Sequence, residues 1–188
     1  MENPAPSQAM RQLPNLLTLG RIAATPGIVV LLFWPDNQLL CFIAALVFSA
    51  AAITDYLDGY YARRYAIVST LGKFMDPLAD KLLVIATLIM LTSVQRVEGW
   101  IVCVIVGREL AITGLRGIAA EKGVVIAAEK LGKWKTGFQI GALIPLLIHF
   151  TYLGISFHLL GIITLWVALF LTILSGVDYF RNFSRLMR

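Results

Sequence analysis

Charged residues are scarce in this chain. Asp, Glu, Lys and Arg make up 14% of its 188 residues, whereas hydrophobic residues make up 59%, and the mean hydropathy is +0.80. A soluble globular domain needs far more polar surface than this composition provides. The scarcity of charge therefore excludes an ordinary soluble domain and predicts an integral membrane protein.

The sequence also has no pattern of a disulfide framework, of an internal repeat or of a cleavable signal peptide. Cys41 and Cys103 are the two cysteines, and both lie in apolar runs, which excludes a disulfide framework and favours buried thiols. No internal repeat is present, which argues against a transporter built from inverted repeats. The first apolar run carries polar residues and has no small-residue cleavage site, so we do not expect a cleavable signal peptide.

Long apolar runs, by contrast, are abundant. Each is close to the roughly 20 residues that a helix needs to cross a membrane. Six helices with short connections account for the whole chain, so we expect an all-α membrane protein with one domain over residues 1–188. Residues 1–12 form a polar or interfacial lead-in. The apolar runs cover residues 13–34, 39–61, 78–94, 100–119, 137–153 and 159–180.

The distribution of basic residues predicts the orientation of these spans. The connections WPDNQ, VQRVEG and YLGISFH share one side of a six-span chain, and of the 16 Lys and Arg only Arg96 falls there. By the positive-inside rule the opposite side, with both termini, faces the cytoplasm. The net charge of +5 therefore indicates topology and attraction to anionic membrane lipids, not nucleic-acid binding.

Four aspartates stand beside two of the most apolar runs, in the aspartate segment TDYLDGYYARRYAIVSTLGKFMDPLADK, residues 54–81. A charged side chain at bilayer depth costs about 2.5–3.5 kcal/mol, so their presence needs an explanation. On a helix, Asp55, Asp58, Gly59 and Ala62 recur at i, i+3, i+4 and i+7. They would share one stripe near the cytoplasmic end of the second span.

The second half of the aspartate segment has a matching pattern. Gly72, Asp76 and Asp80 recur at i, i+4 and i+8, on one face of the helix that enters the third span. Because the intervening segment is short, the two helices should be antiparallel neighbours whose carboxylates converge. Such a group cannot stay fully ionised alone, and its two carboxylate pairs suit a site for two Mg²⁺ or Mn²⁺ ions. Alternatively, the aspartates pair with nearby Arg and Lys at the interface.

The complete pattern is Asp55-x2-Asp58-Gly59-x2-Ala62-Arg63-x8-Gly72-x3-Asp76-x3-Asp80. It resembles the signature of the CDP-alcohol phosphatidyltransferases, DxxDGxxAR-x8-GxxxDxxxD, without departures. The resemblance implies six transmembrane helices, a homodimer and a divalent-metal site open to the cytoplasm. It also implies transfer of a substituted phosphoryl group from a CDP-linked donor to an alcohol, with release of CMP.

The resemblance also implies roles for individual residues. Asp80 would be the catalytic base that activates the acceptor hydroxyl. The metal site would be formed by Asp55, Asp58, Asp76 and Asp80. The CDP part of the donor would be contacted by Asp55, Gly59, Ala62, Arg63 and Gly72.

Other segments bear on the acceptor. LPNLLTLGRIAATP, GRELAITGLRGIAAEKG and KLGKWKTGFQ resemble phosphatidylglycerophosphate synthases. That implies CDP-diacylglycerol as donor, glycerol 3-phosphate as acceptor and the cytoplasmic (inner) membrane as location. Phosphatidylglycerol, as in a cardiolipin synthase, serine and an inositol phosphate remain alternative acceptors. A divalent-cation transporter is an alternative of another class, disfavoured because the outer halves of the spans carry few polar residues.

Two further groups are candidates for the site. Asn15, Thr18 and Arg21 recur along one face of the first span and can line a cavity, although Arg21 can equally snorkel to the interface. Arg108 stands next to Glu109 deep in the fourth span, which marks a lined cavity or a structural ion pair. A phosphate-bearing acceptor needs a cationic pocket. The candidates for it are Arg108, Arg116, Lys133 and Lys135.

Overall fold

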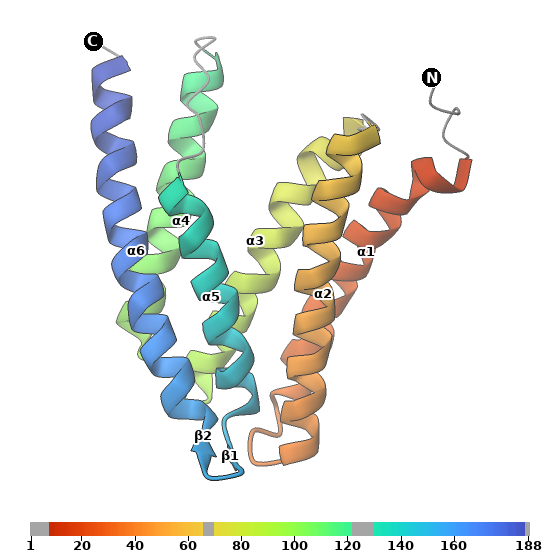
Figure 1. Cartoon of the computed structure of the whole chain (residues 1–188), viewed down its shortest axis with the longest axis vertical. Helices are drawn as coiled ribbons and strands as arrows, with labels where there is room; N and C mark the ends of the chain where they lie inside the picture. Colours follow the sequence, from red (N-terminus) through yellow and green to blue (C-terminus); the bar gives the residue numbers. More distant parts are fainter. Residues whose placement is uncertain (1–7, 66–69, 122–129, 187–188) are drawn as a thin grey trace. The chain divides into compact units, whose positions relative to one another are not determined.

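The computed structural model describes residues 8–65, 70–121 and 130–186; within them, the side chains of 8–18, 55–78, 80, 130 and 186 lie outside the described set. The described chain is predominantly helical (Figure 1). It forms six helices and one small hairpin. The helices are α1 (Gln8–Leu31), α2 (Gln38–Tyr65), α3 (Thr70–Ser93), α4 (Gly99–Glu121), α5 (Lys130–Ile148) and α6 (Phe157–Leu186); the strands are β1 (Thr151–Tyr152) and β2 (Ile155–Ser156).

The chain divides into two units, residues 1–90 and 91–188. In the first unit α1 packs against α2, and Ile28, Leu32 and Phe48 are among the buried apolar side chains. Helix α2 begins after Asn37, whose Oδ1 accepts a 3.2 Å hydrogen bond from the backbone N–H of Leu40. This is an N-cap, which satisfies one of the backbone donors left over at a helix start.

In the second unit α6 packs against both α5 and α4. Gly161 of α6 permits the close approach to α5: a Cβ placed there would lie 2.6 Å from Leu146 Cγ and 3.0 Å from the Leu146 backbone nitrogen. Close helix contacts through small residues are the usual means of association inside membranes, where the hydrophobic effect does not drive helices together.

A short antiparallel hairpin joins α5 to α6, with Thr151 opposite Ser156. Its two turn residues, Leu153 and Gly154, have φ of 53° and 79°, as a type I′ turn requires. The expected apolar span over 137–153 is therefore wrong at its end. The helix stops at Ile148, because the chain takes a positive φ at the next residue and then enters β1.

The connection between α3 and α4 is tied to the end of α5 by a buried arginine. Arg96 is 3% exposed, and its Nη1 donates to the backbone oxygens of Leu146 and Leu147, at 3.3 and 3.0 Å. The last carbonyls of a helix have no partner within the helix. Arg96 therefore caps α5. This gives a structural role to the one Lys or Arg that the predicted topology places on the side opposite the cytoplasm.

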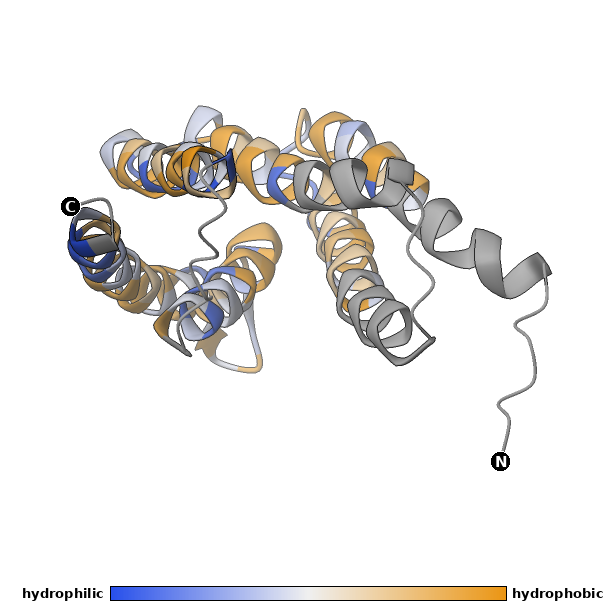
Figure 2. Ribbon diagram, turned by 90° about the horizontal axis from the view of Figure 1, so that it is seen from above, coloured by the Kyte–Doolittle hydropathy of each residue, from blue (hydrophilic) through white to orange (hydrophobic). Residues whose placement is uncertain are grey.

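Apolar residues predominate along the described helices (Figure 2). Within the described part of the chain, α6 is long and apolar enough over Phe157–Arg185 to cross a membrane; Leu19–Leu31, Gln38–Thr54 and Lys81–Ser93 are apolar but shorter. Six helices were predicted, and the described residues form six. That all six span a membrane stays a prediction. The polar or interfacial character predicted for residues 1–12 stays a prediction: α1 begins within them, at Gln8, and residues 1–7 lie outside the described part.

Candidate active site

The aspartate segment is helical on both sides of residues 66–69, which lie outside the described part. Helix α2 runs through Asp55, Asp58, Gly59, Ala62 and Arg63 to Tyr65, and α3 runs from Thr70 through Gly72, Asp76 and Asp80. The helical periodicity assumed for the segment is therefore present in the backbone. The side chains fall outside the described set, so the convergence of the four carboxylates stays a prediction.

Metal binding by the aspartate segment has the right chemistry. Among the described side chains, no group of three or more His, Cys, Asp and Glu is placed to hold a metal ion, but that set does not include the four aspartates. Four carboxylates at helical spacing offer only hard oxygen donors, which are the ligands that Mg²⁺ and Mn²⁺ prefer. The donor set fits a divalent cation.

The polar residues of α1 are only partly within the described set. The side chains of Asn15 and Thr18 lie outside it. Arg21 is 1% exposed, and its backbone oxygen accepts a hydrogen bond from Thr25 Oγ1 at 3.1 Å. Because its side chain is enclosed by the protein, Arg21 does not snorkel to the surface here, and this leaves the proposed cavity role open.

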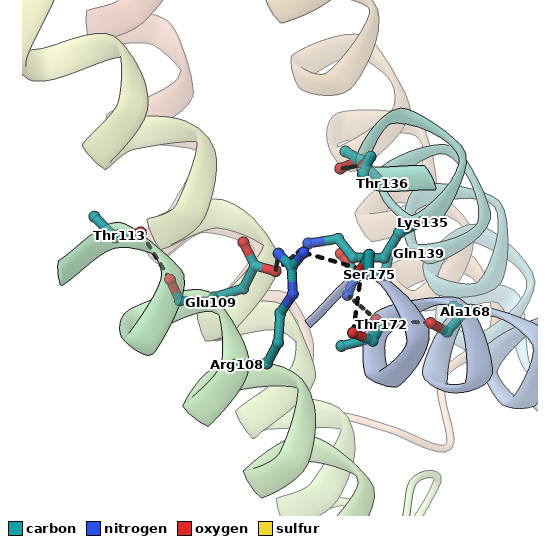
Figure 3. Close-up of polar contacts among 10 residues, drawn as sticks. Arg108, Glu109, Thr113, Lys135, Thr136, Gln139, Ala168, Thr172 and Ser175 are labelled. Atoms are coloured by element: carbon teal, nitrogen blue, oxygen red, sulfur yellow. Dashed lines mark hydrogen bonds and ion pairs between the residues drawn. The ribbon is translucent and has the colours of Figure 1, made fainter. Parts of the chain in front are cut away.

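The second unit holds a charged cluster built from two helices. Arg108 and Glu109 are consecutive on α4, and Lys135 lies on the second turn of α5. Arg108 Nη1 lies 3.2 Å from Glu109 Oε1, and Lys135 Nζ contacts the same oxygen. We call Arg108, Glu109 and Lys135 the Glu109 cluster (Figure 3). It combines two cations with one anion.

Helix α6 supports the Glu109 cluster from a third direction. Arg108 Nη2 donates to Ser175 Oγ at 2.9 Å, and Ser175 Oγ donates in turn to the backbone oxygen of Thr172 at 3.1 Å. Beside it, Gln139 Nε2 of α5 lies 3.5 Å from Thr172 Oγ1. Figure 3 shows these side chains from α4, α5 and α6 pointing toward one another.

The remaining acceptor candidates lie elsewhere in the second unit. Arg116 is exposed, with its Cζ 5.6 Å from the centre of the Tyr179 ring, a cation–π contact. Lys133 is also exposed. Of the four candidates, the structure thus brings Arg108 and Lys135 together through Glu109 and places Arg116 and Lys133 outside that contact.

Sequence reasoning missed the α6 side of this cluster. Ser175 and Thr172 are buried polar residues in the most apolar helix, and Gln139 stands one helical turn after Lys135. Polar side chains inside a membrane helix point to partners or function, so a search for them would have found these positions. It would not have shown which helices they join.

The arrangement suits anion binding. Two cations that share one carboxylate oxygen leave a local excess of one positive charge, and guanidinium and ammonium groups both bind phosphate oxygens well. The Glu109 cluster is largely enclosed: the side chains of Arg108, Glu109 and Lys135 are 15%, 17% and 4% exposed. Electrostatic interactions are stronger in such a partly dehydrated setting.

Comparison with known proteins identifies the family. A family model described as CDP-alcohol phosphatidyltransferase matches residues 11–174, which contain the aspartate segment and the Glu109 cluster. A CDP-diacylglycerol–glycerol-3-phosphate 3-phosphatidyltransferase of Bacillus subtilis is 42% identical over 91% of this chain and 94% of its own length. A Rickettsia typhi protein of the same name is 42% identical over 92% and 97%.

A more distant relative carries a different name. A cardiolipin synthase (CMP-forming) of Oryza sativa is 36% identical over 97% of this chain, but the match covers 60% of that protein. The match to the family model extends over most of the chain and includes every residue of the aspartate signature. The chain belongs to the CDP-alcohol phosphatidyltransferase family.

Proposed function

We propose that this protein transfers the phosphatidyl group of CDP-diacylglycerol to glycerol 3-phosphate, forming phosphatidylglycerophosphate and CMP in phospholipid biosynthesis. The observation that carries the proposal is the complete aspartate signature in a member of this family. Its relatives at about 42% identity are named CDP-diacylglycerol–glycerol-3-phosphate 3-phosphatidyltransferase. The signature supports the donor and the chemistry, and the relatives support the acceptor.

The aspartate segment would carry the reaction. Asp80 takes the proton of the acceptor hydroxyl while the hydroxyl oxygen bonds to the donor phosphorus and the diphosphate bond to CMP breaks. The divalent cations would be held by Asp55, Asp58, Asp76 and Asp80. When bound, Mg²⁺ or Mn²⁺ offsets the charge of the diphosphate and of the leaving CMP.

The other residues of the signature would bind the donor. Arg63 supplies a cation for the diphosphate, and Gly59 and Gly72 have no side chain, which lets a bulky ligand approach the helix backbone. Asp55 and Ala62 complete the contacts to the cytidine diphosphate. Asn15, Thr18 and Arg21 of α1 would line the cavity.

Binding of a phosphate-bearing acceptor requires cations. Arg108, Arg116, Lys133 and Lys135 are the proposed set, and the contact that Arg108 and Lys135 make with one carboxylate oxygen supports these two most directly. The phosphate of glycerol 3-phosphate is the part of the acceptor that Arg108 and Lys135 would bind.

Six membrane spans with both termini in the cytoplasm are part of the proposal. The six helices and the position of nearly all basic residues on one side support it, as the positive-inside rule predicts. The site would then face the cytoplasm at the inner membrane, where the water-soluble acceptor meets a donor anchored in lipid. A homodimer is proposed on the family resemblance alone.

Other acceptors are the main alternative. The Oryza sativa relative named cardiolipin synthase favours phosphatidylglycerol as the second candidate, and serine or an inositol phosphate would use the same chemistry. A divalent-cation transporter is the remote alternative, since a family of transferases offers it no support.

The deciding experiment measures CMP release. Purified protein receives CDP-diacylglycerol and Mg²⁺ or Mn²⁺, with glycerol 3-phosphate, phosphatidylglycerol, serine or inositol phosphate offered separately. We expect CMP release with glycerol 3-phosphate. Release with another acceptor and none with glycerol 3-phosphate would overturn the proposal.

A further inference from the structure

Glu109 is an acidic residue to which the proposed reaction assigns no role. Its Oε1 contacts Arg108 Nη1 of its own helix and Lys135 Nζ of α5. Two nitrogens that contact one oxygen lie within about 6 Å of each other, twice a hydrogen-bond length. That spacing lets both nitrogens reach oxygens of a single phosphate group.

Helix α6 restricts Arg108 as well. Arg108 Nη2 donates a hydrogen bond to Ser175 Oγ. Gly176 leaves room for the Arg108 side chain, because a Cβ at Gly176 would lie 3.3 Å from Arg108 Cγ. Arg108 Nε is buried and has no hydrogen-bond partner among the described residues. The guanidinium is therefore held by Glu109 on one side and by α6 on the other.

We propose that Glu109 is a positioning residue for the acceptor: its carboxylate holds Lys135 and Arg108 together as one phosphate-binding pair. This inference rests on the proposed function and deepens it. Without the carboxylate, two cations in a largely enclosed setting repel each other, and the buried ammonium of Lys135 loses a charge partner. They would separate, and the phosphate would lose one of its two contacts.

The test compares E109Q with E109D. We expect E109Q to raise the KM for glycerol 3-phosphate about tenfold or more, as for a lost charge-assisted contact. The KM for CDP-diacylglycerol and kcat should change about twofold or less, because the donor and the base are not involved. E109D keeps the charge and should lie between wild type and E109Q. The matched control is E121Q, which removes an exposed acid from the same helix and should leave both KM values unchanged.

Three outcomes would overturn the proposal: an unchanged acceptor KM in E109Q, an equal rise in both KM values, or an equal effect of E109D and E109Q. If E109Q does not fold, the double variant E109Q/K135M, which removes the charges of both Glu109 and Lys135, is compared with K135M. We expect E109Q to raise the acceptor KM little further once K135M is present, since the two residues act as a unit. Independent, additive effects would contradict the proposal.

Inorganic phosphate separates this proposal from the proposed function. It should inhibit competitively against whichever acceptor releases CMP, and E109Q should weaken that inhibition about tenfold. Equal inhibition of wild type and E109Q would overturn the role of Glu109 even if glycerol 3-phosphate is the acceptor. Failure of wild type to use glycerol 3-phosphate would overturn the proposed function and leave the comparison of phosphate inhibition to decide the role of Glu109.

Discussion

The aspartate segment and the Glu109 cluster place charge in apolar surroundings by different means. The four aspartates lie within 28 consecutive residues (54–81), which also carry four basic residues, and they recur at helical spacing on two consecutive helices. The Glu109 cluster is mainly basic and combines residues from α4 and α5 with support from α6. Local spacing makes the first recognisable in the sequence, whereas tertiary packing creates the second.

The comparison also separates chemistry from selection of the substrate. The first group would hold the metal and the donor and perform the transfer, while the second would choose the acceptor. Substitutions in the aspartate segment should therefore affect turnover with every acceptor. Substitutions in the Glu109 cluster should affect KM for one substrate.

The largest effect is expected for Asp80→Asn. Loss of the proposed base should lower kcat roughly 10³-fold, within the usual range for general-base catalysis, while CDP-diacylglycerol still binds. The measurement is the rate of CMP release together with donor binding. Asp36→Asn, in an exposed turn outside the helices, is the control and should retain activity. Near-normal turnover in the Asp80 variant would remove the proposed base.

Asp76→Asn should change the metal requirement. Replacing one carboxylate ligand with an amide weakens binding of a hard cation, so we expect the half-saturating Mg²⁺ concentration to rise about tenfold or more. A titration of activity against Mg²⁺ and Mn²⁺ measures this. An unchanged titration curve would count against a metal site in the aspartate segment.

Lys135→Met should raise the KM for glycerol 3-phosphate about tenfold and leave the KM for CDP-diacylglycerol nearly unchanged. Methionine retains much of the length of the buried side chain without its charge. Lys133→Met, which removes an exposed cation two residues earlier, should have a smaller effect. If Lys133→Met has the larger effect, the Glu109 cluster is not the main phosphate contact.

The smallest effect on activity is expected for Gly161→Ala, which concerns packing alone. Its Cβ would lie 2.6 Å from Leu146 Cγ, and overpacking of this kind costs about 1–3 kcal/mol. Thermal unfolding in detergent should show a lower Tm with both KM values unchanged. At Gly141, where a Cβ would lie 3.9 Å from Thr164 Cγ2, alanine should be tolerated. Equal Tm values for the two variants would contradict the close contact.

The helices could be predicted well and their ends less well. Apolar runs indicated six helices because each is long and nearly uninterrupted. The hairpin was missed because its strands have two residues each, too few for a period-two pattern to emerge. Helix α5 begins earlier than its apolar run, at Lys130, because a helix continues into polar sequence where nothing terminates it.

By itself, the sequence determined the six helices, the helical spacing of the aspartate signature and the family, since each depends on residues close together in the chain. Only the tertiary structure decided that Lys135 contacts the Glu109 oxygen that Arg108 also contacts, and that Ser175 accepts a hydrogen bond from the Arg108 guanidinium. These contacts join α4, α5 and α6. Neither helical periodicity nor residue type specifies them, because they depend on which faces of the helices pack together.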